Sequence, residues 1–329
     1  MKKILFTVMA LALLVGASSC KKEMEGKYAP KEKIQSVYQE RTVCNNDSVI
    51  QQEPKFKSEE WTWENNVLDR ITYFDQYAYE NEEGDGMETE LVQLYVQLFK
   101  YDGDGRLSKS EILGMASMKA EYEYDGKYLK TMAIYDEGDM LVTYQFNHEG
   151  SKITSFDLTL GDELVDKNKN AMQQLERVNP LRFVMEVEPA SKVMAATKSC
   201  AKRSAKVGSK ANPVVHFDME WSGDNVSKIW ANYMGATMQY NFNYDNKNNP
   251  FYNLFEMVAM VNEGFVPFLP LSKNNVTGIA ETYIEDGESD TYSLAYTYTY
   301  NNKDYPTSKK EGDDYGEYRY ETTYYYEYK

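Results

Sequence analysis

The strongest constraint on the fold is a strict two-residue alternation of side chains near the C-terminal end. Across residues 291–300, aromatic or aliphatic side chains alternate with Thr, Ser and Ala, and across 318–328 tyrosines alternate with charged residues. Successive side chains of a β-strand point to opposite faces, so this pattern predicts two strands that each carry a tyrosine-rich face. The aromatic face comprises Tyr292, Leu294, Tyr296, Tyr298 and Tyr300 in the first strand and Tyr318, Tyr320, Tyr324, Tyr326 and Tyr328 in the second.

Composition and turn spacing extend this prediction to most of the chain. There are 29 Tyr among 329 residues, and tyrosine favours half-buried pleated surfaces. Asp-Gly, Asn-Asn and similar pairs recur between alternating runs, and Gly105, Gly126 and Gly150 lie 21 and 24 residues apart. We therefore expect a mainly β fold, an extended and twisted antiparallel sheet of repeated hairpins. One or two short helices are predicted in addition, at 171–184 and 253–265.

The turn motifs carry a family resemblance. YDGDGRL and YEYDGKYL resemble the tyrosine–aspartate repeats of bacterial wall-associated and Rhs-type proteins. QYNFNYDNKNNPF, LPLSKNNVTGI and YTYTYNNKDYPTSK resemble a domain of unknown function common in Bacteroides-type lipoproteins. The resemblance covers most of 58–160 and 213–329. It implies an architecture of β-hairpin repeats and carries over no catalytic or binding residue.

The first twenty residues are typical of an export signal. Lys2 and Lys3 precede an apolar run from Ile4 to Val15, and small residues lead to Cys20. This resembles a bacterial lipobox, although Ala17 stands where leucine is more usual. It predicts a signal peptide at 1–19, lipid attachment (palmitate among the acyl chains) at Cys20, and an outer-membrane lipid anchor with the periplasmic or cell-surface face left open. The alternative is ordinary secretion with an incidental cysteine.

The remaining chain divides by composition into four parts. Residues 20–57 are predicted as lipid anchor and tether, 58–160 as a β-hairpin repeat region, 161–212 as an irregular or helical insert with a basic linker, and 213–329 as a C-terminal β repeat region. Removal of 1–19 takes the net charge from −16 to −18 because Lys2 and Lys3 are lost. Such a chain is repelled by nucleic acid. Cys44 and Cys200 are predicted either to pair or to remain thiols.

The stretch KYDGDGRLSKSE, residues 100–111, has the spacing of a calcium loop at Asp102, Asp104 and Glu111. Lys100, however, stands where the first carboxylate ligand should be, and the preceding segment alternates like a strand. We therefore interpret the stretch as a β-hairpin turn, with these carboxylates only a weak metal candidate. No cofactor is predicted.

A catalytic centre is not indicated. His148 and His216 are the only histidines, and neither has partners at the spacing of a zinc site or a catalytic triad. Glu317, Arg319, Glu321 and Glu327 on one face of the last strand exclude a membrane-spanning barrel, whose outward face must be apolar.

Function is therefore sought in the tyrosines. The chain is predicted to be a non-catalytic envelope lipoprotein that binds a glycan or an envelope protein through an aromatic surface. The candidate residues are Tyr296, Tyr298, Tyr300, Tyr324 and Tyr326. One alternative is a structural or assembly subunit in which the tyrosine rows form the core, and another is a hydrolase with an unrecognised carboxylate pair.

Overall fold

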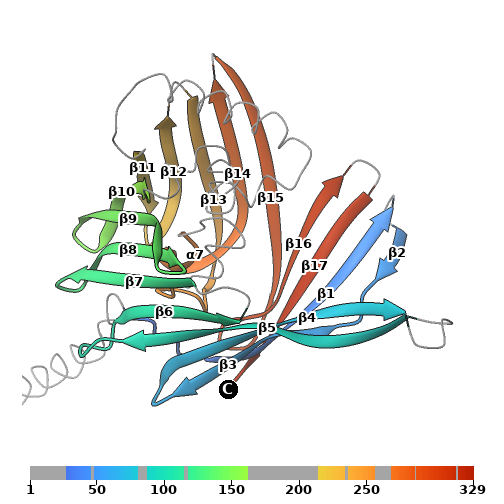
Figure 1. Cartoon of the computed structure of the whole chain (residues 1–329). Coiled ribbons are helices and arrows are strands. Elements are labelled where there is room, and N and C mark those ends of the chain that lie inside the picture. Colours follow the sequence, from blue (N-terminus) through green and yellow to red (C-terminus); the bar gives the residue numbers. More distant parts are fainter. Residues whose placement is uncertain are drawn as a thin grey trace, which may run out of the picture.

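The computed structural model describes residues 27–45, 48–80, 87–114, 118–161, 214–233, 236–255, 268–285, 287–315 and 318–329. Within them the chain is almost entirely β-structure (Figure 1). The strands are β1 (Ile34–Asn45), β2 (Ser48–Gln52), β3 (Phe56–Glu64), β4 (Val67–Glu80), β5 (Met87–Tyr101), β6 (Leu107–Gly114), β7 (Met118–Asp125), β8 (Tyr128–Asp136), β9 (Asp139–Glu149), β10 (Lys152–Leu160), β11 (Val214–Ser222), β12 (Asn225–Tyr233), β13 (Ala236–Asn248), β14 (Asn274–Glu285), β15 (Glu288–Tyr300), β16 (Pro306–Tyr315) and β17 (Tyr318–Tyr328), with one short helix, α7 (Phe268–Leu271). No helix in these ranges is long and apolar enough to cross a membrane.

The sheet closes on itself. From β3 to β17 each strand pairs antiparallel with the next, β17 pairs with β1, and β1 pairs with β3. β2 and β3 lie one after the other along the same side of β1, since β2 pairs with Thr42–Asn45 and β3 with Ser36–Gln39. The 17 strands therefore occupy 16 positions of a closed antiparallel barrel.

The predicted extended sheet of hairpins is therefore wrong. The individual hairpins form as expected, with Gly105, Gly126 and Gly150 in the left-handed conformation at their turns. Closure depends on pairing between β1 and β17, whose contacts join residues such as Glu40 and Tyr325, 285 positions apart. The strands β1 and β2 and the start of β3 lie inside residues 20–57, where the sequence indicated a tether.

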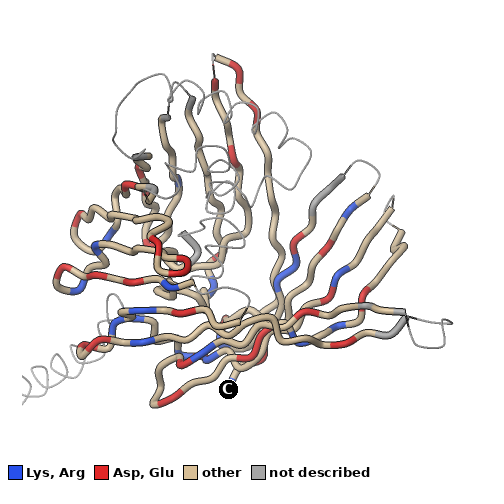
Figure 2. The backbone as a smooth tube through the Cα atoms, in the orientation of Figure 1, with Lys and Arg blue, Asp and Glu red and all other residues tan. Residues whose placement is uncertain are grey.

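Over much of its wall the barrel is apolar inside and polar outside. On β5 and β6 apolar side chains also face outward, since Val96 and Leu98 alternate with the buried Gln97 and Phe99, and Val96 pairs with the exposed Leu113. On β9 the buried residues are Val142, Tyr144 and Phe146, and they alternate with the solvent-facing Gln145 and Asn147. The same division holds on β15, where Ser293, Thr297 and Thr299 are exposed. Charged residues are spread along strands and turns around the barrel (Figure 2). A barrel that spans a membrane has the opposite arrangement, with an apolar band facing lipid.

The charged residues that we took to exclude a membrane-spanning barrel do lie on the outward side. Arg319 and Glu327 of β17 are exposed, whereas Glu321 is only 8% exposed and pairs with Lys310 and Arg319; Glu317 lies outside the described residues. Their polarity argues against lipid contact at this wall, but it carried no information about whether the sheet closes.

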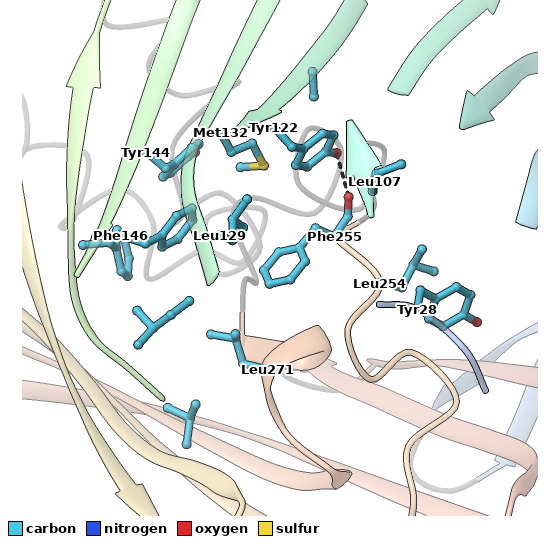
Figure 3. Close-up of a cluster of buried hydrophobic side chains, with 14 of the residues drawn as sticks. Tyr28, Leu107, Tyr122, Leu129, Met132, Tyr144, Phe146, Leu254, Phe255 and Leu271 are labelled. Atoms are coloured by element: carbon cyan, nitrogen blue, oxygen red, sulfur yellow. Dashed lines mark hydrogen bonds between the residues drawn. The ribbon is translucent and has the colours of Figure 1, made fainter. Parts of the chain in front are cut away.

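One end of the interior is filled by the connection between β13 and β14 (Figure 3). Leu254, Phe255 and Leu271 of this connection belong to the same buried cluster as Tyr122 on β7. The Tyr122 hydroxyl donates to the Phe255 carbonyl at 2.7 Å, and Tyr28 donates to Pro250 at 3.0 Å. We call Asn249–Phe255 together with α7 the plug, because these residues occupy the space that the barrel encloses.

Several predicted features fall outside the described residues. These are Cys20, Cys200, the helix at 171–184 and the basic linker. The helix at 253–265 lies partly outside as well, and its described part, Asn253–Phe255, is not helical. Cys44 is a buried free thiol on β1.

Candidate functional site

Tyr296 and Tyr298 of β15 and Tyr324 and Tyr326 of β17 face the barrel interior, whereas Tyr318 and Tyr320 at the start of β17 are exposed. Tyr326 packs edge-on against Phe251 of the plug, with ring centroids 6.1 Å apart. Tyr298 donates a hydrogen bond to the Val276 carbonyl at 2.8 Å. Tyr296 and Tyr326 are buried, whereas Tyr298, Tyr300 and Tyr324 are half-buried. Tyr296, Tyr298, Tyr324 and Tyr326 thus lie on the inner side of the barrel wall and do not form an outward platform.

Between the two rows β16 brings a lysine and a glutamate inward. Lys309 lies between Tyr298 and Tyr324 in the strand register, and Glu311 lies between Tyr296 and Thr322. We call Tyr296, Tyr298, Tyr324 and Tyr326 with Lys309 and Glu311 the tyrosine wall.

The charged pair is held by both tyrosine rows. The ammonium of Lys309 is 2.7 Å from Glu311 Oε2, and it lies 5.1 Å and 4.7 Å from the ring centroids of Tyr296 and Tyr324. The Tyr324 hydroxyl donates to Glu311 Oε1 at 2.9 Å. This arrangement combines an ion pair, cation–π contacts and a charge-assisted hydrogen bond.

The protonation states follow from these contacts. Burial alone would lower the pKa of Lys309, but the neighbouring Glu311 carboxylate outweighs it and holds that pKa well above its ordinary value. Burial raises the pKa of Tyr298 to about 12 and that of Tyr326 further. At neutral pH the wall therefore presents neutral hydroxyls and one internally compensated ion pair.

Sequence reasoning missed Lys309 and Glu311. The run SKKEGD carries charges of both signs and no aromatic residue. The available signal was their two-residue spacing in a strand between two tyrosine strands, which places both on the same face.

A second inward carboxyl group lies on β14. Glu281 is opposite Tyr240 on β13 and Tyr292 on β15, and the Tyr240 hydroxyl donates to its Oε1 at 3.3 Å. Its Oε2 has no hydrogen-bond partner among the described residues. Burial raises the pKa of Glu281 to about 7, with the Tyr240 hydrogen bond opposing the shift.

Glu281→Gln should change how stability depends on pH. The native carboxyl binds its proton more tightly than the unfolded one, whose ordinary pKa is 4.5, so its stabilising contribution is complete at low pH and is lost as pH rises through about 7. We expect the variant to be about 2 kcal/mol more stable than the wild type at pH 8, and near parity at pH 4. Denaturant unfolding at both pH values measures this. A constant difference between the two proteins at both pH values would contradict it.

The 100–111 stretch is a hairpin turn, as predicted. The Asp102 carboxylate accepts hydrogen bonds from the Asp104 and Arg106 backbone N–H groups, both at 2.9 Å, and from the Arg106 side chain at 2.7 Å. Burial raises the pKa of Asp102, but these hydrogen bonds outweigh it and hold the pKa below its usual value. Glu111 is paired with Lys100 and Lys109 at 2.7 and 2.5 Å. Asp102 and Glu111 therefore have protein partners already.

Asp102→Ala should destabilise the protein by about 1–2 kcal/mol, because two backbone donors of the turn lose their acceptor. Asp104→Ala is the matched control, since Asp104 is largely exposed and pairs only with Arg106; we expect less than about 0.5 kcal/mol there. Thermal unfolding of both variants tests the difference. A binding heat with millimolar calcium, lost in Glu111→Ala, would overturn the hairpin-only interpretation of this loop.

The remaining candidates lie apart from the wall. His216 is on the outer face between Asp157 and Asp218, at 2.7 and 3.3 Å, and its hydrogen bond with Asp157 raises its pKa. His148 contacts the Leu129 carbonyl at 2.6 Å. Among the described residues, no three His, Cys, Asp or Glu side chains gather as a metal site.

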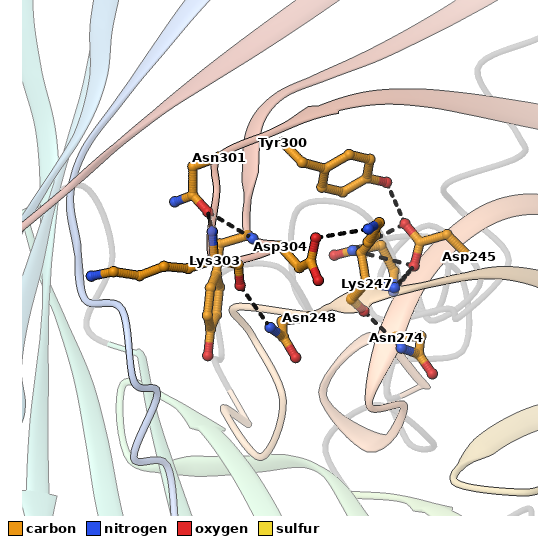
Figure 4. Close-up of polar contacts among 10 residues, drawn as sticks. Asp245, Lys247, Asn248, Asn274, Tyr300, Asn301, Lys303 and Asp304 are labelled. Carbon is orange, nitrogen blue, oxygen red and sulfur yellow. Dashed lines mark hydrogen bonds and ion pairs between the residues drawn. The ribbon is translucent and has the colours of Figure 1, made fainter.

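Tyr300 belongs to a separate polar network near the turns of β13–β16 (Figure 4). Its hydroxyl donates to Asp245, which also accepts from the Asn275 backbone N–H at 3.1 Å. Lys247 pairs with Asp304 at 2.7 Å. Because these groups satisfy one another, Tyr300 is best explained by holding this end of the barrel together, and we leave it out of the tyrosine wall.

No protein-family model matches the chain, and no curated protein matches it. Similar solved structures include a porin-like protein from Bacteroides uniformis, with a TM-score of 0.47 and 12% identity over 90% of this chain and 98% of that one. Another is a porin-like protein from Bacteroides vulgatus, with a TM-score of 0.35 and 10% identity over 91% and 99% of the two chains. With both scores below 0.5, the barrel assignment rests on the strand pairings of this chain.

The resemblance to tyrosine–aspartate hairpin repeats is wrong. Tyr101, Tyr122 and Tyr124 of those motifs point into one closed barrel, where Tyr101 donates to Leu68 at 2.8 Å and Tyr122 bonds to the plug. The motifs are shared because tight β-turns favour Asp and Gly in any antiparallel hairpin. They therefore do not distinguish a repeat array from consecutive strands of a barrel.

Proposed function

We propose that this chain is a non-catalytic envelope protein whose barrel binds a glycan at the tyrosine wall. In this proposal residues 1–19 direct export and are removed, and a lipid on Cys20 anchors the protein to the outer membrane. The largely polar outward face of β7–β17 supports a barrel that is surrounded by water and is attached to the membrane only through its N-terminal tether.

The observation that carries the proposal is the ion pair set between two tyrosine rows. A barrel wall needed only for packing would be filled by apolar side chains, because a charged pair must recover the cost of its desolvation. The side chains of Lys309 and Glu311 are 23% and 22% exposed, although the Glu311 Oε2 atom itself is buried.

The chemistry of the wall suits a sugar ring. Tyrosine rings offer flat apolar faces for the C–H faces of a sugar, while the ammonium and carboxylate can donate to and accept from neighbouring hydroxyls. Since Lys309 and Glu311 compensate each other, the wall does not select for a charged ligand. The acidic balance of the chain further disfavours polyanions.

We do not expect the inward carboxyls Glu281 and Glu311 to act as a hydrolytic pair. Their register partners on β15, Tyr292 and Tyr296, are four residues apart, and two strand spacings separate β14 from β16. At about 3.3 Å per residue and 4.8 Å per strand, their backbones are roughly 16 Å apart. Paired glycosidase carboxyls lie within about 5–9.5 Å of each other, so the geometry favours binding over hydrolysis by these two groups.

The test is binding of the mature chain to a broad panel of soluble oligosaccharides and polysaccharides, followed by calorimetry and by quenching of Tyr and Trp fluorescence. Tyr324→Ala should weaken glycan binding about tenfold, because one stacking surface and the hydroxyl bonded to Glu311 are lost. Tyr325→Ala is the matched control: the next residue faces outward, bonds Glu40 at 2.8 Å and contacts Lys55. Its affinity should be unchanged.

Two results would overturn the proposal. One is indifference of the folded wild-type protein to the whole panel. The other is an equal loss of affinity in Tyr324→Ala and Tyr325→Ala, which would place the binding surface away from the wall.

A further inference from the structure

A basic pocket lies where the start of β1, the end of β17 and the β3–β4 turn meet. It has a volume of about 710 Å³ and is lined by Lys31, Lys33, Trp63, Asn65, Asn66 and Lys329. The lining contains three cations and no carboxylate side chain. In a chain whose net charge is −16, such a site is a local exception to the overall repulsion of anions.

Lys33 is fixed at the centre of this lining. Its ammonium donates to Asn66 Oδ1 at 2.6 Å and lies 5.2 Å from the Trp63 ring centroid. Trp63 is itself fixed, since its Nε1 donates to the Ile34 carbonyl at 2.7 Å and its ring stacks on Tyr28 at 5.7 Å. The ammonium is therefore positioned before any ligand arrives, which lowers the ordering cost of binding.

The other polar groups are brought to the same place by the backbone. The Lys329 N–H donates to the Lys33 carbonyl at 2.9 Å, which holds the end of β17 beside the start of β1. Asn65 and Asn66 form the β3–β4 turn with φ of 47° and 69°. Of the nearby acids, Glu32 is already paired with Lys303 at 2.6 Å, and Glu64 is an exposed residue at the end of β3.

We propose that this pocket binds a phosphate group, as a phosphate mono- or diester. Ammonium groups are compact hydrogen-bond donors that suit the oxygens and the negative charge of phosphate. Three ammonium groups carry more positive charge than is needed to balance the single negative charge of a carboxylate ligand. The Trp63 ring, beside the Lys33 ammonium, gives the pocket an apolar edge.

Two sources of phosphate are compatible with this site: a lipid headgroup and a free phosphate ester. Lys31 lies 11 residues after Cys20, a reach of at most about 40 Å for an extended chain. If Cys20 carries the lipid, as proposed above, the pocket is within reach of the membrane surface. Only this preference for the headgroup rests on the proposed function, whereas the phosphate chemistry of the pocket does not.

The experiment uses the mature chain with Cys20→Ser, which removes any acyl anchor. Calorimetry with inorganic phosphate and with glycerol phosphate measures the free anion, and flotation with phosphatidylcholine vesicles, with and without phosphatidylglycerol, measures the headgroup. The test variant combines K31Q, K33Q and K329Q. The matched control combines K127Q, K130Q and K152Q, three lysines near the β7–β8 and β9–β10 turns that do not line the pocket.

We expect the test variant to lose about tenfold in affinity and the control variant less than twofold. Binding of glycerol phosphate without flotation on anionic vesicles assigns the site to a free ester, and binding of both assigns it to a headgroup. No binding by either route, or an equal loss in both variants, overturns the proposal. Glycan binding is measured on the same lysine variants, so failure at the tyrosine wall is distinguishable from failure here.

Discussion

Phe156→Ala should lower the free energy of unfolding by about 4 kcal/mol, the usual cost of emptying the place of a buried aromatic ring. Phe156 on β10 is 2% exposed and stacks on Phe217 of β11, with centroids 4.6 Å apart and ring planes 9° from parallel. It also lies 6.0 Å from the Phe146 ring. The loss should appear as a lower denaturant midpoint at an unchanged slope.

This variant also tests which face of β10 is inside. Asp157, the next residue, points outward to His216 at 2.7 Å, so Asp157→Ala should cost less than about 1 kcal/mol. Guanidinium titrations followed by circular dichroism compare the two variants directly. A large cost for Asp157→Ala together with a small one for Phe156→Ala would reverse our assignment of the faces.

Lys309→Met should destabilise the barrel by about 2 kcal/mol, because Glu311 would keep its charge in a half-buried place without its cation. This expected loss of stability is smaller than the loss from breaking a fully buried ion pair, because the side chains of Lys309 and Glu311 remain partly exposed. The double change Lys309→Met with Glu311→Leu should return to within about 1 kcal/mol of the wild type, since apolar replacements of a paired charge cost little.

Glycan binding separates the structural from the functional role of this pair. If the wall is a binding site, the double variant is stable but binds glycan at least tenfold more weakly. Lys310→Met is the matched control, because Lys310 points outward to Glu321, which Arg319 also contacts. Full affinity in the stable double variant would mean that the ion pair serves only the fold.

The local pattern of the strands was predictable from the sequence. The division of β17 into a tyrosine face and a charged face is the one that the alternation of Tyr324, Tyr326 and Tyr328 indicates, and the register with β1 and β16 agrees with it. The turns at Gly126 and Gly150 were predictable as well, since a left-handed backbone favours glycine. Both features depend only on neighbouring residues.

The closure of the barrel and the plug were not predictable in this way. The pairing of Glu40 with Thr323 cannot be recognised from the residues around either position. An edge strand and a strand paired on both sides show the same alternation of polar and apolar side chains. The plug residues Leu254 and Phe255 looked like the start of a helix, and their burial depends on strands distant in sequence, such as β7 with Tyr122. Which face of each tyrosine strand points inward can be assigned only when the closure of the sheet is known.

The most direct test of the account is therefore a disulfide across the β1–β17 seam. In the mature chain with Cys20, Cys44 and Cys200 changed to serine, Glu40→Cys is combined with its register partner, Thr323→Cys. The offset control combines Glu40→Cys with Glu327→Cys, which pairs four residues away with Ser36. Paired Cα atoms of neighbouring strands are about 4.5–5.5 Å apart, within the range of a disulfide.

We expect the Glu40→Cys/Thr323→Cys chain to form an intramolecular disulfide under mild oxidation, identified by mass spectrometry of its proteolytic peptides, while the offset pair stays reduced. A reduced matched pair in a folded protein, or equal crosslinking of both pairs, would mean that β1 and β17 do not meet in this register and that the barrel is not closed as described.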